Sequence, residues 1–205
     1  MITITSIEKS GKRTMQVFLN GEPAFPVYTS ALRGLGISRG MQLEGEEAAS
    51  LLRSVEKMAQ TAAMNMLLRR SLSEHELRQK LLRRGYAAEF TEKAIDYVRS
   101  FHYIDDSRYA ESFIAFRAGK ESRSRIRIKL RQKGIDDQII EHELERADFD
   151  DSEGIRRDLD RLLRKYGQVP DRDSRDYQKI CQSLLRRGYS WHDVRHALDT
   201  FSKTV

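Results

Sequence analysis

Apolar residues in this chain recur at fixed distances from three glycines, Gly85, Gly134 and Gly188, which lie roughly 50 residues apart. On both sides of each glycine the apolar positions are spaced by three and four residues, as on one face of an α-helix. In the three copies these positions are Leu77, Leu81, Tyr86, Ile95 and Val98; Ile126, Leu130, Ile135, Leu144 and Ala147; and Ile180, Leu184, Tyr189, Leu198 and Phe201. The pattern predicts a tandem array in which two amphipathic helices of each copy meet at the glycine.

Each glycine is predicted to end the first helix of its copy, because only glycine adopts the left-handed backbone conformation at low cost. In two copies a start signal for the second helix follows at once: Asp136 in the middle copy, and Ser190 with Asp193 in the last. In the first copy the second helix starts near Ala87, which has no side-chain oxygen. We therefore expect that helix to be less well capped.

A further helix is predicted ahead of each pair, because apolar residues there also follow helical spacing. These stretches are residues 46–70, 106–118 and 152–166. In the second of them, Tyr109, Phe113 and Phe116 predict a stripe that faces the core. The fold class is therefore mainly α, with about nine helices in three tandem three-helix repeats that form an elongated, curved array. We expect repeat 1 over residues 46–104, repeat 2 over 105–150 and repeat 3 over 151–205.

Residues 1–45 differ in pattern and predict a small β-rich N-terminal extension. Isoleucines alternate near the start, residues 15–19 read as a strand, and Asn20-Gly21 is a hairpin signal before a further strand at residues 24–28. Pro23 and Pro26 restrict this last strand to a sheet edge, because proline has no N–H to donate. A segment of this size buries too little surface to fold alone, so we expect it to dock on repeat 1.

The composition agrees with helices that are well exposed to water. Charged residues make up 33% of the 205 residues, and the mean hydropathy is −0.64. Cys181 is the single cysteine, which excludes an internal disulfide and is typical of a reducing compartment. We interpret it as a small buried apolar residue. The sequence has no apolar run of membrane length and no signal peptide in residues 1–13, which predicts a cytoplasmic protein without membrane contact.

Positive charge is concentrated in the first glycine-bounded helix of repeat 2. Six cations and no acid occupy it: Arg123, Arg125, Arg127, Lys129, Arg131 and Lys133. The segment that follows is rich in acids, so the basic helix suits either internal compensation or docking to a partner. Further cations stand beside the other two glycines, at Arg83, Arg84, Arg186 and Arg187. Their position in the last helical turn is also explained by the helix dipole. We name these ten residues as candidate contacts with a partner.

Motifs of enzymes and of cofactor sites are missing from the sequence. It contains no glycine-rich phosphate loop and no dinucleotide fingerprint. His192 and His196 have the spacing of metal ligands on a helix, but no third ligand is evident. We predict a protein that is not an enzyme and has neither cofactor nor metal. A helix-turn-helix module that reads DNA bases is disfavoured, because acids begin the helix after each turn and would meet the phosphates.

Three segments resemble the RecX family. They are residues 103–110 (Tyr-Ile-Asp-Asp-Ser-Arg-Tyr-Ala), residues 125–135 with their Lys-Gly-Ile ending, and residues 184–189 (Leu-Leu-Arg-Arg-Gly-Tyr). The similarity runs from about residue 62 to residue 201. Arg131 departs from the pattern, because Leu82 and Leu185 hold the matching positions, so repeat 2 is expected to pack less tightly.

The resemblance implies a regulator of the RecA recombinase. It implies binding to RecA and to the RecA filament on single-stranded DNA, a location in the filament groove, and inhibition of strand exchange and ATP hydrolysis, with roles in DNA repair, homologous recombination and the SOS response. We expect the basic helix to face the filament and the chain to be a monomer with at most weak direct binding to DNA. The alternative is a helical repeat module that competes for single-stranded DNA through phosphate contacts.

Overall fold

The computed structural model describes residues 1–147, 150–166 and 169–204. The chain folds into two compact units, residues 1–105 and residues 106–205. The four-part division expected from the sequence stays a prediction, and so does the elongated, curved arrangement.

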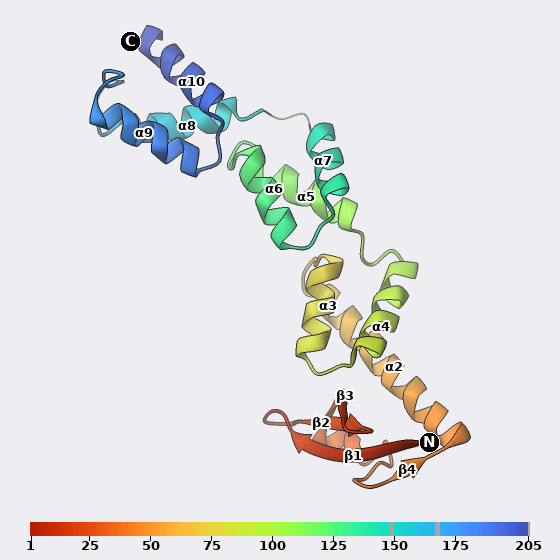
Figure 1. Cartoon of the computed structure of the whole chain (residues 1–205). Helices are drawn as coiled ribbons and strands as arrows, with labels where there is room; N and C mark the ends of the chain where they lie inside the picture. Colours follow the sequence, from red (N-terminus) through yellow and green to blue (C-terminus); the bar gives the residue numbers. More distant parts are fainter. Residues whose placement is uncertain (148–149, 167–168, 205) are drawn as a thin grey trace. The chain divides into compact units, whose positions relative to one another are not determined.

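The first unit begins with an antiparallel sheet in the order β3-β2-β1-β4 (Figure 1). The strands are β1 (Ile2–Lys9), β2 (Thr14–Leu19), β3 (Glu22–Tyr28) and β4 (Gln42–Leu43), and a single helical turn, α1 (Thr29–Leu32), follows β3. Asn20 and Gly21 both have positive φ values, 51° and 94°, as the tight turn between β2 and β3 requires. The predicted hairpin is confirmed, and the strand that carries Pro23 and Pro26 lies at an edge of the sheet.

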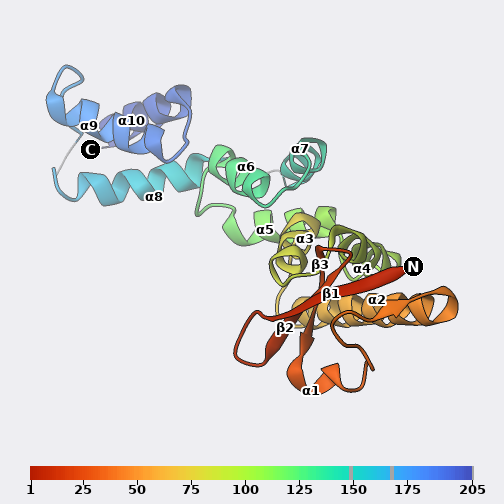
Figure 2. The ribbon, with the colours of Figure 1, turned by 60° about the horizontal axis from the view of Figure 1, so that its bottom comes forward.

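The sheet packs on the first repeat, which consists of α2 (Gly45–Leu67), α3 (Glu74–Arg83) and α4 (Ala88–Ser100) (Figures 1 and 2). Phe25 of the sheet and Leu81 of α3 are fully buried in one common core. Two hydrogen bonds also join the parts: the Gln16 side-chain amide donates to the Gly85 carbonyl (2.9 Å), and the Ala87 amide donates to the Ala24 carbonyl (2.7 Å). The expected docking of the extension on repeat 1 is confirmed.

The second unit holds two further helix triplets. They are α5 (Asp106–Arg117), α6 (Arg123–Gln132) and α7 (Asp137–Arg146), followed by α8 (Ser152–Leu163), α9 (Arg175–Arg186) and α10 (Trp191–Thr204). Each triplet has its own apolar core. The described residues thus contain ten helices, nine in the three triplets plus the single turn α1, and the predicted mainly helical fold of tandem repeats is confirmed.

The glycine positions were predicted correctly. Gly85, Gly134 and Gly188 have φ values of 101°, 74° and 88°. In each copy the glycine amide donates to the carbonyl three residues back, and the next amide donates to the carbonyl five residues back, as Tyr86 does to Leu81. This paired pattern ends a helix and satisfies its last carbonyls. Ala87 indeed provides no side-chain cap, whereas the Asp136 side chain caps α7.

Two details of the predicted apolar pattern are wrong. Phe116 is 68% exposed, and the buried residues of α5 are instead Ala110 and Ile114. The core-facing line of α5 therefore runs one position later than the aromatic stripe, and Tyr109 and Phe113 pack at its margin. Ala147 is exposed, because α7 ends at Arg146, one residue before it.

Candidate partner-binding surface of the basic helix

The basic helix α6 is fixed in repeat 2 by its cap and its apolar side. The Ser122 hydroxyl accepts a hydrogen bond from the Arg125 amide, which satisfies a free donor of the first turn. Ile126 and Leu130 are fully buried one turn apart. The cations on the remaining faces are therefore held at defined positions beside the rest of the repeat.

Acids of the same repeat neutralise three of these cations. Arg127 binds Glu141 of α7 through both its Nε and Nη2 atoms, the second at 2.7 Å. Lys129 lies 2.6 Å from a carboxylate oxygen of Glu121, in the loop before α6. The third pair is formed by Arg131 and Asp137, at 2.6 Å. Within repeat 2, internal compensation is thus the arrangement that the structure shows.

The pKa values of the paired acids reflect these contacts. The hydrogen bond from Arg127 lowers the pKa of Glu141. For Glu121, burial alone would raise the pKa, but hydrogen bonds from Lys129 and Arg117 outweigh it and the pKa is lowered. Both carboxylates therefore stay charged at neutral pH, and the cations beside them stay paired.

The two cations at the ends of the basic segment also have contacts within the chain. The Arg123 guanidinium donates to the Leu144 carbonyl (2.9 Å), and its backbone amide donates to the Asp151 carboxylate (2.9 Å). Lys133 lies over the Tyr109 ring, 5.6 Å from its centroid. Arg123 and Lys133 therefore both make contacts within the second unit.

One face of α6 remains open to solvent. Arg125 and Arg131 have side chains that are 51% and 52% exposed, and Ile128 between them is 49% exposed. The spacing of three residues places them on one side of the helix. Arg125 has only a loose ion pair, at 3.8 Å from Glu121. We call Arg125, Ile128 and Arg131 the open face of α6. It combines exposed apolar area with two cations, as protein-binding surfaces often do.

Of the four candidate cations beside the other glycines, two contact a side chain of the same chain and two are exposed at helix ends. Arg187 lies 2.8 Å from the Asp158 carboxylate, and the Arg84 guanidinium donates to the Tyr28 hydroxyl (3.3 Å). Arg83 and Arg186 are exposed at the ends of α3 and α9.

The Ser122 hydroxyl donates to the Arg187 carbonyl (2.8 Å), so the start of α6 lies beside the end of α9. Arg83 and Arg84 belong to the first unit.

Sequence reasoning missed the ion pairs between the helices of a repeat. Arg127 and Glu141 are 14 residues apart, and so are Arg78 and Glu92, which form the corresponding bidentate pair in repeat 1. Each pair has its arginine seven residues before the glycine and its glutamate seven after it. Alignment of the copies at charged positions as well as apolar ones shows this repeated spacing, but the contact between the two side chains comes from the structure.

The described residues form neither a metal-binding cluster nor a membrane-spanning helix. Among the residues that the structure describes, no group of three or more His, Cys, Asp or Glu side chains could hold a metal ion. Within the same residues, every helix is too short or too polar to cross a bilayer.

The fold is that of a tandem three-helix repeat protein. Three sequence models of the RecX family match the chain: the first three-helix domain over residues 59–97, the second over 105–144 and the third over 159–198.

Relatives agree over most of the chain. The regulatory protein RecX of Clostridium acetobutylicum is 27% identical, and the match covers 96% of this chain and 94% of that protein. The regulatory protein RecX of Vibrio vulnificus is 33% identical over 66% of this chain and 88% of its own length. A crystal structure of regulatory protein RecX superposes with a TM-score of 0.67 at 26% identity, and the match covers 97% of this chain and 100% of that one. The chain belongs to the RecX family, and the relatives described above are named regulatory protein RecX.

Proposed function

We propose that this chain is a non-enzymatic regulator that binds RecA and its filament on single-stranded DNA and inhibits strand exchange and ATP hydrolysis. Membership of the RecX family along all three repeats is the observation that carries the proposal. In this proposal the chain lies in the filament groove. Three repeats in one chain offer several weak contacts to the repeating protomers of a polymer, and such contacts add up to useful affinity.

Within this proposal, the open face of α6 contacts the filament. The structure supports this choice over the whole basic helix, because the ion-paired side chains of Arg127 and Lys129 are only 30% and 29% exposed. Four cations of α6 form ion pairs, and among them Arg125 and Arg131 have the most exposed side chains. The exposed side chain of Ile128 adds apolar surface, from which water would be displaced when a partner binds.

A second candidate function is a module that binds single-stranded DNA directly. The observation in its favour is a row of exposed aromatic rings at the end of α4. Tyr97 and Phe101 have ring centroids 5.0 Å apart, and Phe101 and Tyr103 lie 6.0 Å apart. Exposed rings of this kind can stack on bases. Against it, the most basic helix has acids beside its cations, which would repel phosphates.

A pull-down comparison separates the two functions. The tagged chain is incubated with RecA alone, with RecA assembled on single-stranded DNA by a non-hydrolysable ATP analogue, and with the DNA alone. We expect the strongest retention with the assembled filament, weaker retention with RecA alone, and little with DNA at physiological salt. Equal retention of free DNA and of filament, with a steep loss as salt rises, would instead favour the DNA-binding module.

A further inference from the structure

An ion pair joins the two glycine-linked helices in repeats 1 and 2. In repeat 1, Arg78 of α3 donates to both carboxylate oxygens of Glu92 of α4, at 2.7 and 2.9 Å. In repeat 2, Arg127 of α6 and Glu141 of α7 form the same bidentate pair. These hydrogen bonds raise the pKa of each arginine and lower that of each glutamate. A planar guanidinium–carboxylate pair therefore fits between these helices.

Repeat 3 has other residues at the two positions of this pair. The position seven residues before the glycine holds Cys181 instead of arginine, and the position seven after it holds Arg195 instead of glutamate. Of these two positions, the one on the second helix, α10, therefore has the cation, and neither has a carboxylate. Arg195 is exposed, and no ion pair to it is formed by the residues that the structure describes.

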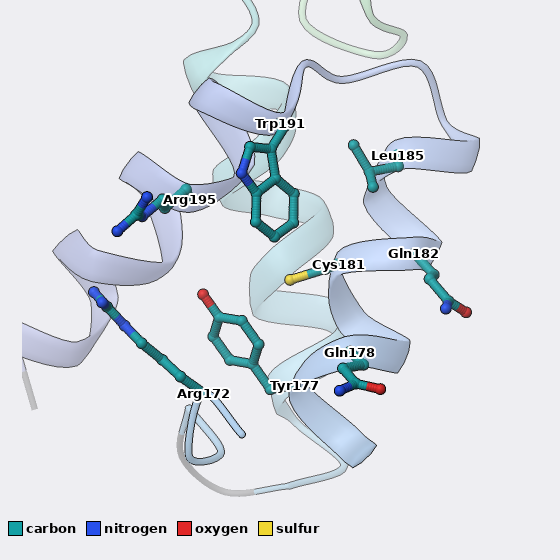
Figure 3. Close-up of a pocket in the computed structure, with 8 residues that line it drawn as sticks. All are labelled: Arg172, Tyr177, Gln178, Cys181, Gln182, Leu185, Trp191 and Arg195. Atoms are coloured by element: carbon teal, nitrogen blue, oxygen red, sulfur yellow. The ribbon is translucent and has the colours of Figure 1, made fainter. Parts of the chain in front are cut away.

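In repeat 3 no such pair joins the described residues of α9 and α10, and a pocket of about 400 Å³ lies between these helices. Tyr177, Cys181 and Trp191 point toward its middle, and Arg172 and Arg195 lie along one side (Figure 3). Leu185, Gln178 and Gln182 line the other side. Arg172 is already bound to Asp199 (2.6 Å), so Arg195 is the cation that this pocket offers to a ligand.

The lining also offers apolar area. Trp191 is 52% exposed and Leu185 is 38% exposed, whereas Tyr177 and Cys181 are buried and form the floor. Tryptophan and arginine are the side chains that most often dominate binding energy when a partner covers them. The pocket is therefore suited to an acidic side chain that is followed by an apolar one.

A nucleic acid strand fits this site less well than a peptide does. Asp176, Asp193 and Asp199 lie on α9 and α10, close to the lining residues in sequence. Asp176 is bound to Lys179 and Asp199 to Arg172, so Arg195 is the lining cation that remains, and one cation suits a single carboxylate better than successive phosphates. Repeats 1 and 2 show in addition that an arginine between the two glycine-linked helices pairs with a carboxylate.

We propose that the α9–α10 groove of repeat 3 binds a short acidic and apolar peptide segment of a partner protein, with its carboxylate on Arg195 and its apolar side chain on Trp191. Arg195 stands at the position of Glu92 and Glu141, so the polarity of the pair is reversed: the partner carboxylate takes the side of the groove that Arg78 and Arg127 fill in the other repeats, where α9 has Cys181. The inference deepens the proposed function, since it names the chemistry of one docking element. It rests on that function only for the identity of the partner.

Trp191 provides the readout, because it is the only tryptophan of the chain. The purified full chain is titrated with the peptide acetyl-Gly-Leu-Glu-Glu-Phe-Gly-amide while its fluorescence is recorded. The matched probe has both glutamates replaced by glutamine, and a short oligothymidylate serves as the nucleic acid. We expect a saturable change with the acidic peptide and roughly tenfold weaker binding of the glutamine peptide, because the charged hydrogen bonds to Arg195 are lost.

The variants Arg195→Glu and Arg161→Glu complete the design. Arg195→Glu restores the residue type of repeats 1 and 2 and should weaken binding of the acidic peptide by about tenfold or more. Arg161→Glu changes the net charge equally on α8, away from the lining residues, and should leave the affinity unchanged. Far-ultraviolet circular dichroism checks that both variants keep the helical fold.

Three outcomes would overturn the inference. The first is a response to oligothymidylate in place of the acidic peptide. The second is equal binding of the glutamate and glutamine peptides, and the third is no saturable response up to about 5 mM peptide, which excludes millimolar or tighter affinity. RecA is not present in this experiment, so its failure would leave the proposed binding to the filament standing.

Discussion

Leu130→Ala is expected to destabilise repeat 2 by about 2 to 5 kcal/mol, because it opens a cavity in a closed apolar core. Leu130 is fully buried between α5, α6 and α7, in a cluster with Ile114, Ile126 and Leu144. This cluster is separate from the core of residues 1–105 and from that of α8 to α10. The loss of stability should therefore be confined to repeat 2, as expected for repeats that each contribute their own stability.

Amide hydrogen exchange measured by mass spectrometry checks this result. Exchange should become faster in α5, α6 and α7 and stay unchanged in the sheet and in α2 to α4. The control Ile128→Ala lies on the same helix, but its side chain is 49% exposed, so its effect on stability should be within about 0.5 kcal/mol. Equal acceleration along the whole chain would show that the repeats unfold as one body and contradict the account.

The double variant Arg125→Glu/Arg131→Glu is expected to lower the inhibition of RecA at least tenfold. It reverses both cations of the open face of α6 and would set like charges against an acidic filament surface, which costs about 1.4 kcal/mol or more. Both side chains are about half exposed, so the fold should persist. The measurement is the concentration of variant that halves ATP hydrolysis by RecA on single-stranded DNA.

The choice of these two arginines follows from their exposure. Arg127 and Lys129 have side chains that are only 30% and 29% exposed beside Glu141 and Glu121, so their reversal would set carboxylates together inside the repeat, whereas Arg125 and Arg131 lie where water screens the added charge. The matched control is Lys12→Glu/Arg13→Glu, which changes the net charge equally at an exposed turn of the N-terminal sheet. Equal loss of inhibition in both double variants would mean that overall charge matters and that α6 is not the contact.

The repeats could be predicted from the sequence because each depends on local rules. A glycine is needed where φ is positive, as at Gly134, and apolar residues at helical spacing are buried, as at Ile126 and Leu130. The stripe that included Phe116 failed because two faces of α5 carry apolar residues. The small Ala110 lies on the face that packs inward, while the larger ring at position 116 stays outside.

The pairing of the cations could not be predicted in the same way. Whether Arg127 faces a partner or Glu141 depends on how α6 packs against α7, and helical periodicity does not contain that information. The pocket of repeat 3 could not be predicted for the same reason. Cys181 and Arg195 are ordinary residues when each is considered alone, and only the structure shows that their counterparts bind each other.

The most direct test of the account is a titration of the unmodified chain into preformed filaments of RecA on single-stranded DNA, with ATP hydrolysis as the signal. A regulator that contacts several protomers should inhibit when it is far less abundant than RecA, and free single-stranded DNA added as competitor should not relieve the inhibition. Inhibition that requires at least one chain per RecA protomer and disappears with added free DNA would contradict binding to the filament.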